Sequence, residues 1–276
     1  MIARMKKVFP ALVFLLAAAV AAGWLWLRRF EYHELYAPAA AIEHTPAQYQ
    51  LRYQDVQFLA ADGTALTGWW IPANRPRGTV VYCHGNAGNI GGRAELAPEF
   101  VRRGFNLLLW DYRGYGRSAG RPSEKGFYDD ARAAYDAAAA MSGELPIVVY
   151  GHSLGGAVAI RLAQDRPAAG LIVQGAFASA ADIARRRYPD LPLDRLLSVS
   201  FDAAQAAAAL PDVPKLIGHS PADETVPFQS GRILHAAAAP PKEFVLLAGG
   251  HNDSSWFTPG GAGNAELEAF LGRFGR

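Results

Sequence analysis

The stretch Ile147-Val148-Val149-Tyr150-Gly151-His152-Ser153-Leu154-Gly155-Gly156 predicts a strand, a sharp turn and a helix in direct succession. Its first half is a β-branched and aromatic run typical of a buried strand, and an amphipathic stretch begins directly after Ser153. The residues around Ser153 match G-x-S-x-G, in which small residues let the chain turn without steric clash and expose the serine hydroxyl. The N–H of Leu154, at the helix start, is placed to stabilise a developing oxyanion. The pattern therefore predicts Ser153 as a nucleophile.

Strand and helix patterns alternate on both sides of this motif, which is typical of an α/β protein with a doubly wound, mostly parallel sheet of eight strands. The later strands are continuous apolar runs, as expected where helices cover both faces of a sheet. We expect one domain over residues 50–276. The predicted strands are Gln50–Leu59, Ala65–Ile71, Thr79–Cys83, Asn106–Trp110, Ile147–Tyr150, Leu171–Val173, Lys215–Ile217 and Phe244–Leu247. The predicted helices are Arg93–Arg102, Glu124–Met141, Leu154–Asp165, Gln229–Ala238 and Asn264–Phe274.

A serine hydroxyl needs a base before it can act as a nucleophile at neutral pH. His251 follows the last predicted strand in a loop rich in small residues, where the carboxyl end of the sheet could present it to Ser153. The alternative is an ordinary exposed loop histidine. The interpretation as a base is favoured by the order of the elements along the chain.

The carboxylate that orients such a base should lie between the serine and the histidine in the sequence. Asp223 lies in a turn after a strand and fits this position, with Glu224 as the adjacent rival. Asp202 and Asp253 are weaker rivals because they are less clearly placed at the end of a strand, and a plain turn aspartate remains the alternative. The order Ser153, Asp223, His251 is the order of a catalytic triad in α/β hydrolases.

A second oxyanion donor is predicted after the third strand, where the chain reads His84-Gly85-Asn86-Ala87-Gly88-Asn89. We assign the N–H of Asn86 to this role. The rival interpretation is a phosphate-binding loop, because Gly85, Gly88, Gly91 and Gly92 lie close together. Neither G-x-G-x-x-G nor G-x-x-x-x-G-K-[ST] is present there, which weakens that interpretation. The neighbouring Cys83 is interpreted as a buried strand residue.

Composition excludes several other classes. The 276 residues carry a formal charge of only +2, which gives no support to nucleic-acid binding. A single cysteine excludes an intramolecular disulfide and a cysteine-based zinc or iron–sulfur site. We expect no metal and no organic cofactor, and the oligomeric state is not predicted.

Residues Val8 to Leu27 form 20 consecutive uncharged residues, which as a helix would span about 30 Å, the thickness of a bilayer core. We expect residues 1–28 to be a single-pass membrane anchor, with a cleavable signal sequence as the alternative. Residues 29–49 are predicted as a juxtamembrane linker. More basic residues precede the apolar run (Arg4, Lys6, Lys7) than follow it (Arg28, Arg29), which places the body on the extracytoplasmic, in a bacterium periplasmic, face.

Taken together, these motifs resemble the α/β-hydrolase superfamily, and within it the small, often membrane-anchored branch described as serine-aminopeptidase-like, which includes lysophospholipases and protein depalmitoylases. The matching segments are His84–Asn89, Asp111-Tyr112-Arg113-Gly114-Tyr115-Gly116-Arg117-Ser118, Gly151–Gly156, Asp223-Glu224-Thr225-Val226-Pro227 and Gly249-Gly250-His251. The sequence departs from the commonest pattern at Ser220, where glycine is usual, and in a glycine-rich tail after His251.

The resemblance implies Ser153 as nucleophile, His251 as base and Asp223 as the residue that orients it. It also implies a lid after the sixth strand, which here can only be short, at about residues 176–213. Arg185–Arg187 in this segment are either a solvated helix face or a contact for an anionic headgroup. The expected function is cleavage of an ester or thioester of a small-molecule, acyl or lipid substrate through an acyl-enzyme. The alternatives are a proline-type aminopeptidase, which usually has a larger cap, and a non-catalytic membrane-tethered binding protein.

Overall fold

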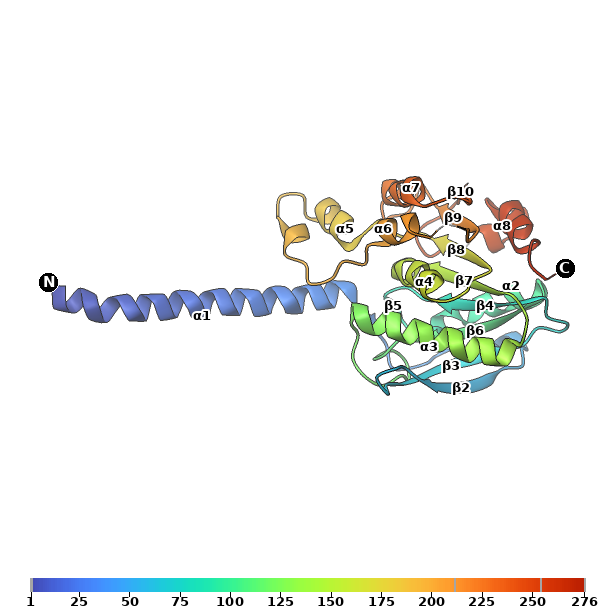
Figure 1. Cartoon of the computed structure of the whole chain (residues 1–276), viewed down its shortest axis with the longest axis horizontal. Coiled ribbons are helices and arrows are strands. Elements are labelled where there is room, and N and C mark those ends of the chain that lie inside the picture. Colours follow the sequence, from blue (N-terminus) through green and yellow to red (C-terminus); the bar gives the residue numbers. More distant parts are fainter. Residues whose placement is uncertain (1, 211, 254, 276) are drawn as a thin grey trace. The chain divides into compact units, whose positions relative to one another are not determined.

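The computed structural model describes residues 2–210, 212–253 and 255–275 (Figure 1). Contacts divide the chain into two units, one ending at Ala37 and the other beginning at Pro38. The first unit is one long helix, α1 (Ile2–Leu35), followed by the short strand β1 (Ala37–Pro38) at the division. The second unit contains the sheet and all the predicted site residues.

The sheet has eight strands in the order β10-β9-β8-β7-β4-β6-β3-β2. Only β3 runs antiparallel to its neighbours β2 and β6, and the remaining pairs are parallel. The eight-stranded, mostly parallel sheet is therefore confirmed, with one edge mixed. The strands are β2 (Gln54–Leu59), β3 (Ala65–Ile71), β4 (Gly78–Cys83), β6 (Phe105–Asp111), β7 (Ile147–His152), β8 (Gly170–Gln174), β9 (Lys215–His219) and β10 (Lys242–Leu246).

Helices cover both faces of this sheet (Figure 1). Helices α3 (Glu124–Ser142), α4 (Leu154–Asp165), α6 (Ala203–Ala208) and α7 (Phe228–Ala237) pack in sequence against one another. Helices α2 (Ala97–Arg102) and α8 (Asn264–Leu271) belong to the opposite layer, where an aromatic cluster that includes Phe100, Phe257 and Phe270 packs on alternate residues of the strands. Because both faces are covered, β4, β6 and β7 are buried at every position, which explains their continuous apolar sequences.

The predicted helix Arg93–Arg102 is in fact two elements. A 3₁₀ helix, η2 (Ile90–Leu96), begins at the cap residue Asn89, whose side chain accepts from the Gly91 N–H. The α-helix α2 begins only at Ala97, with Pro98 in its first turn. Proline fits a first turn because its missing N–H would have no intrahelical acceptor there. The remaining short elements are β5 (Ala87–Gly88), η1 (Pro46–Tyr49) and η4 (Ser255–Phe257).

The region predicted as a linker, residues 29–49, falls partly in helix α1 and partly in the second unit. Helix α1 continues to Leu35, beyond the predicted end of the anchor. Within the second unit, the Asn89 side chain donates to the carbonyl oxygens of Ala39 (2.9 Å) and Ala41 (2.7 Å). The segment after Pro38 is therefore bound to the loop that follows β4.

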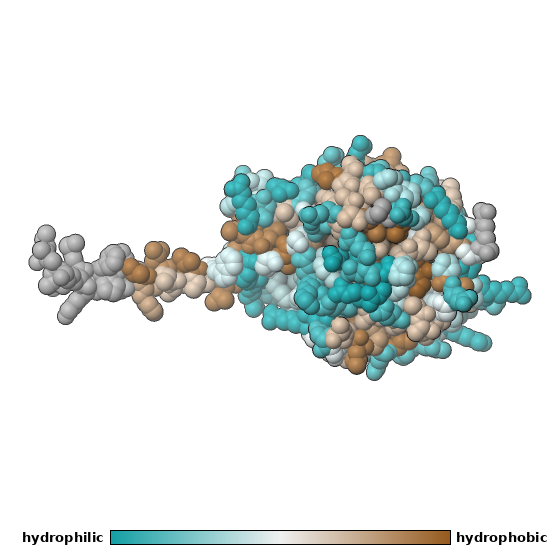
Figure 2. Space-filling view, in the orientation of Figure 1, coloured by the Kyte–Doolittle hydropathy of each residue, from teal (hydrophilic) through white to brown (hydrophobic). Residues whose placement is uncertain are grey.

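The described part of α1 exposes its apolar side chains, which appear brown and tan in Figure 2. Phe14, Leu16 and Leu25 are each more than 60% exposed. The segment Val13–Leu35 is long and apolar enough to cross a membrane, with a mean hydropathy of 1.5. The same length and composition also fit a signal sequence.

The lid consists of α5 (Ala180–Arg187), the 3₁₀ helix η3 (Leu193–Arg195) and the segment that leads into α6. Its two ends are joined by a hydrogen bond from the Ala180 N–H to the Ser200 carbonyl (2.9 Å). The carboxylate of Glu124 holds the returning end, because it accepts from the N–H groups of Ser200 (2.8 Å) and Phe201 (2.6 Å). The lid is thus a short closed loop.

We expect Gly155→Ala to destabilise the fold. A Cβ at Gly155 would overlap the carbonyl oxygen of Cys83, because α4 starts directly against the end of β4. Backbone cannot move aside as a flexible side chain can, so the cost should be about 3 kcal/mol, the upper part of the range for overpacking. Chemical denaturation of the full chain in detergent micelles would measure it. Gly92→Ala is the matched control, since a Cβ there meets nothing within 4 Å; equal stability of the two variants would contradict the prediction.

Candidate active site

Ser153 occupies the turn between β7 and α4 in a conformation that side chains rarely adopt. Its φ is 55° and its ψ is −123°. A non-glycine residue with positive φ costs free energy and is found preferentially at functional sites. The turn is fastened to β8 by a hydrogen bond from the Ser153 N–H to the Gln174 carbonyl (2.9 Å). The side chain lies at the carboxyl end of the parallel strands, as the motif predicts.

Asp223 and His251 are brought together although 28 positions separate them in the sequence. The distance from His251 Nδ1 to Asp223 Oδ2 is 2.7 Å. A carboxylate accepts hydrogen bonds, so Nδ1 carries the proton and the lone pair of Nε2 is left to accept another. This is the tautomer that a general base needs.

The Asp223 carboxylate is surrounded by donors. Oδ1 accepts from the N–H groups of Thr225 (2.9 Å) and Val226 (2.7 Å), and Oδ2 lies 3.3 Å from Nε2 of His219. Burial by itself would raise the pKa of this carboxyl. The hydrogen bonds from His219, His251 and the Val226 N–H outweigh burial and hold the pKa of Asp223 below its usual range. Asp223 is therefore a fixed negative charge beside the imidazole.

His152, directly before the serine, connects the serine turn to the histidine loop. Its Nε2 lies 3.0 Å from the carbonyl oxygen of His251, and the two rings are 4.9 Å apart. Because a carbonyl only accepts, Nε2 is the protonated nitrogen of His152. Burial and the proximity of His251 lower the pKa of His152 to about 3. His152 thus holds the backbone of His251 while remaining neutral.

The hydrogen bonds in the structure distinguish Asp223 from the three rival carboxylates. Glu224 accepts from the backbone N–H of His251 (3.1 Å), so it fixes the loop and not the imidazole ring. Asp253 accepts from a backbone N–H of its own loop (2.6 Å). Asp202 caps the start of α6. Of the four, only Asp223 forms a hydrogen bond with the imidazole in the described structure.

The predicted oxyanion donors lie on either side of Ser153. Leu154 is the first residue of α4, where N–H groups have no intrahelical acceptor. On the other side, a Cβ at Gly85 would lie 3.4 Å from the Cβ of Ser153, so the loop after β4 passes directly beside the serine. The Gly85 carbonyl accepts from Nδ1 of the buried His84 (2.7 Å). Since a trans peptide points its C=O and N–H in opposite directions, the Asn86 N–H faces away from that buried ring.

Comparison with known proteins indicates the family. Residues 74–199 match the family model described as "Serine aminopeptidase, S33". The "uncharacterized protein Rv2307c" of Mycobacterium tuberculosis is 38% identical over 248 residues, covering 86% of each chain. The chain belongs to the α/β-hydrolase family.

Another relative and a solved structure are also similar to this chain. The "Lysophosphatidylserine lipase ABHD12" of Rattus norvegicus is 31% identical over 237 residues, which cover 74% of this hydrolase and 58% of that protein. The Pyrococcus furiosus esterase Pf2001 has the same fold, with a TM-score of 0.70 at 19% identity, covering 88% of this chain and 99% of that structure.

Two tyrosines that sequence reasoning did not assign to the site support the loop after β4, in which the oxyanion donor Asn86 is predicted. Tyr115 donates its hydroxyl to the Asn86 carbonyl (2.7 Å), and Tyr112 donates to the His84 carbonyl (3.1 Å). Both belong to the Asp111–Ser118 motif, which carries the family resemblance. Its Arg113 is bound to the buried Asp130 (2.7 Å), so the motif is structural. The only signal in the sequence for the roles of these tyrosines is that they belong to this motif.

Two further sequence interpretations concern Cys83 and metals. Cys83 is fully buried, and burial raises the pKa of its thiol, which keeps it protonated and unreactive. Within the described residues, no group of three or more His, Cys, Asp or Glu side chains is arranged to hold a metal ion.

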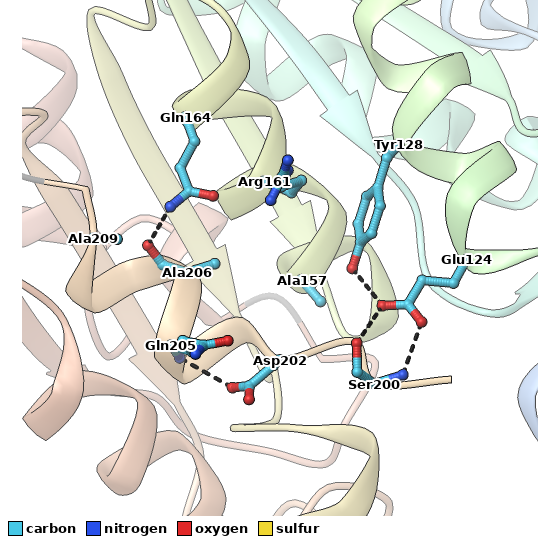
Figure 3. A pocket seen from close by; sticks show the side chains of 10 residues that line it. All are labelled: Glu124, Tyr128, Ala157, Arg161, Gln164, Ser200, Asp202, Gln205, Ala206 and Ala209. Carbon is cyan, nitrogen blue, oxygen red and sulfur yellow. Dashed lines mark hydrogen bonds between the residues drawn. The ribbon is translucent and has the colours of Figure 1, made fainter. Parts of the chain in front are cut away.

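A pocket of about 360 Å³ lies between α3, α4 and the segment that leads into α6 (Figure 3). Its lining is mixed, with Arg161, Gln164 and Asp202 among the polar residues shown and alanines on α4 and α6. Apart from the rival carboxylate Asp202, no predicted site residue lines it, and Ser153, Asp223 and His251 do not. The pocket is therefore separate from the candidate active site.

We expect Asp223→Asn to destabilise the protein at pH 7 and to do so less as the solution becomes acidic. The folded-state pKa of Asp223 is depressed, so the ionised carboxylate contributes stability above its unfolded pKa of about 4, and this contribution is lost as pH falls. The free energy of unfolding of both proteins, measured from pH 7 down to pH 3, would test this. A difference between variant and wild type that is independent of pH would show that the charge of Asp223 is not the stabilising feature.

Proposed function

We propose that the chain is a serine hydrolase that cleaves carboxylic ester or thioester bonds of acyl or lipid-like substrates. The observation that carries the proposal is the His251–Asp223 hydrogen bond of 2.7 Å, together with His152, which joins the His251 backbone to the strained residue Ser153 that follows it in the chain. This combination of orienting carboxylate, base and a serine in a strained turn supports acyl transfer.

The proposed reaction has two halves. The Ser153 oxygen attacks the carbonyl carbon while its proton passes to Nε2 of His251, and the N–H groups of Leu154 and Asn86 stabilise the oxyanion. The tetrahedral intermediate collapses, the leaving alcohol or thiol takes the proton, and an acyl-enzyme remains. Water then attacks the acyl carbon and gives a proton to Nε2 of His251. The second tetrahedral intermediate collapses, the Ser153 oxygen leaves and takes that proton, and the carboxylic acid is released. Asp223 holds the imidazole and stabilises its charged form in both halves.

The relatives support a lipid-like substrate without identifying it. ABHD12 is described as a lysophosphatidylserine lipase, and by analogy a monoacyl lipid is a reasonable first substrate. The family description also names an aminopeptidase activity. An aminopeptidase must recognise a free α-amine and usually has a larger cap, whereas the lid here is a short closed loop. We therefore favour the esterase.

We further propose that residues 1–28 anchor the protein in a membrane, with the hydrolase body from about residue 50 to 276 and its lid at about 176–213. The length and hydropathy of Val13–Leu35 support an anchor. The excess of basic residues before the apolar run favours an extracytoplasmic body.

Ser153→Ala should lower the turnover of p-nitrophenyl esters by roughly a millionfold, because the remaining rate comes only from binding and the oxyanion hole. The assay would use the full chain in detergent micelles and acyl groups of increasing length. Labelling by a fluorophosphonate probe should disappear in parallel. A variant that keeps most of its activity would exclude Ser153 as the nucleophile.

The acyl-length series also separates the candidate substrates. A rate that rises toward long chains would favour lipids, and one that falls would favour a small-molecule carboxylesterase. Serine-dependent cleavage of aminoacyl amides but not of acyl esters would favour the aminopeptidase. Absence of labelling in the wild type would favour a non-catalytic binding protein.

A fusion of alkaline phosphatase to the C-terminus should be active in bacterial cells, since this reporter folds only outside the cytoplasm. The matched fusion to green fluorescent protein should be dark. Replacing all three of Arg4, Lys6 and Lys7 by glutamine should reduce the difference between the two reporter signals, because it removes the excess of basic residues before the apolar run. The opposite reporter pattern would place the body in the cytoplasm.

A further inference from the structure

One feature near the site is not used by the proposed mechanism. The glycine-rich segment Gly85–Gly92, which the sequence offered as a rival phosphate loop, leads directly into Arg93. Arg93 lies on η2, immediately after the loop that carries the oxyanion donor Asn86. It is therefore a cation at the edge of the candidate active site.

The Arg93 guanidinium has only weak partners. Nη1 lies 3.3 Å from the carbonyl oxygen of Gly92 and Nη2 lies 3.5 Å from that of Ala87, both at the long end of hydrogen bonding. Nε is buried and has no hydrogen-bond partner. Across residues 2–210, 212–253 and 255–275, no carboxylate forms an ion pair with Arg93.

The next two arginines along the chain are different. Arg102 and Arg103 on α2 both bind the carboxylate of Glu99, at 2.6 Å and 2.8 Å. A guanidinium offers five N–H donors in a planar fork that fits a carboxylate or a phosphate. The donors of Arg102 and Arg103 are thus occupied by a carboxylate, whereas those of Arg93 can still bind an anion.

Arg93 is close to the reacting groups. Its Nη2 lies 3.5 Å from the carbonyl oxygen of Ala87, the residue after Asn86, and a Cβ at Gly85 would lie 3.4 Å from both Nδ1 of His152 and the Cβ of Ser153. Two residues of extended chain span about 7 Å, so the guanidinium lies within the reach of a small substrate bound at Ser153. The positive charge of Arg93 also contributes to the low pKa of His152, which is consistent with this proximity.

There is room for a ligand beside Arg93. A Cβ at Gly88 or at Gly92 would meet nothing within 4 Å, and Ala87 is exposed. Glu224 and Asp253 are bound to the backbone N–H groups of His251 and Gly250 and form no ion pair with Arg93 in the described structure.

We propose that Arg93 binds an anionic group, a phosphate or a carboxylate, on a substrate whose scissile ester lies at Ser153. This inference rests on the proposed function and narrows its substrate class to anionic monoacyl esters. A lysophospholipid has the required form, since its three-carbon glycerol places the phosphate a few bonds from the acyl ester. The Gly85–Gly92 segment then serves both ends of the substrate, with Asn86 at the ester and Arg93 at the anion.

The first test compares three oleoyl esters of glycerol-like alcohols with different end groups: oleoylglycerol (neutral), oleoyl lysophosphatidic acid (phosphate) and the oleoyl ester of glyceric acid (carboxylate). The full chain is assayed in detergent micelles as wild type, Arg93→Gln, Arg93→Lys and the control Arg102→Gln. The measured quantity is kcat/KM for each anionic ester divided by kcat/KM for the neutral one. For Arg93→Gln this ratio should fall about tenfold or more, the loss expected for a charge-assisted hydrogen bond.

Arg93→Lys should keep part of the selectivity, and Arg102→Gln should keep all of it. A fall limited to the phosphate ester would identify a phosphate site, and a fall for both anions would identify a general anion site. An unchanged ratio in Arg93→Gln, or an equal fall in Arg102→Gln, would overturn the proposal.

A second measurement does not depend on catalysis. Isothermal titration calorimetry would compare binding of 1-O-hexylglycerol 3-phosphate and of neutral 1-O-hexylglycerol, whose ether bond no esterase cleaves. The wild type should bind the phosphate ether more tightly than the neutral ether. Arg93→Gln should lower the affinity for the phosphate ether about tenfold. Retention of this difference in a protein that hydrolyses no ester would refute the proposed function while supporting the anion site. Equal binding of both ethers to the wild type would overturn the anion site.

Discussion

The sharp turn at Ser153 determines where every other part of the site can lie. The chain leaves β7 and enters α4 at once, and the helix can start there only because Gly155 lets it approach the Cys83 carbonyl at the end of β4. In the sheet register, Cys83 pairs with Gly151, so β4 and β7 end at the same level. The loop after β4 must therefore pass beside the serine. One close backbone approach thus brings Ser153, the first N–H groups of α4 and the Asn86 loop together.

The charges around this turn are arranged so that only one group needs to change its protonation. Asp223 receives enough hydrogen bonds to remain ionised despite burial, whereas burial keeps His152 neutral. The imidazole of His251 lies between them, bonded through its ring to the carboxylate and through its backbone carbonyl to His152. A positive charge that develops on His251 then meets one fixed negative charge and no competing cation on the neighbouring ring. Preorganisation of this kind lowers the reorganisation needed during a reaction.

Sequence patterns could predict those parts of the molecule that depend on local periodicity or on strand ends. The buried strands gave continuous apolar runs, and α4 was predicted to the residue because Ser153 and Asp165 bound a clear amphipathic pattern. The division of residues 90–102 into η2 and α2 was missed, because it depends on the cap formed by Asn89 and on Pro98. The pairing of Asp223 with His251 was predicted from the order of the elements, with the adjacent Glu224 left as a rival. Only the folded loops show that Asp223 reaches the imidazole ring and Glu224 the backbone N–H of His251.

Arg93 illustrates the same limit and also what structure adds to function. In the sequence it is one of many basic residues in a nearly neutral chain, and the glycines before it suggest a nucleotide loop without the required spacing. In the structure, those glycines leave open space, and the arginine lacks a carboxylate partner within the described residues. Binding energy from a group remote from the reacting bond can hold an ester in the geometry for attack, so that it contributes to the rate as well as to affinity. A cation on the same short segment as the proposed oxyanion donor is well placed for this, because any displacement of the anion from Arg93 would also move the ester carbonyl relative to Asn86.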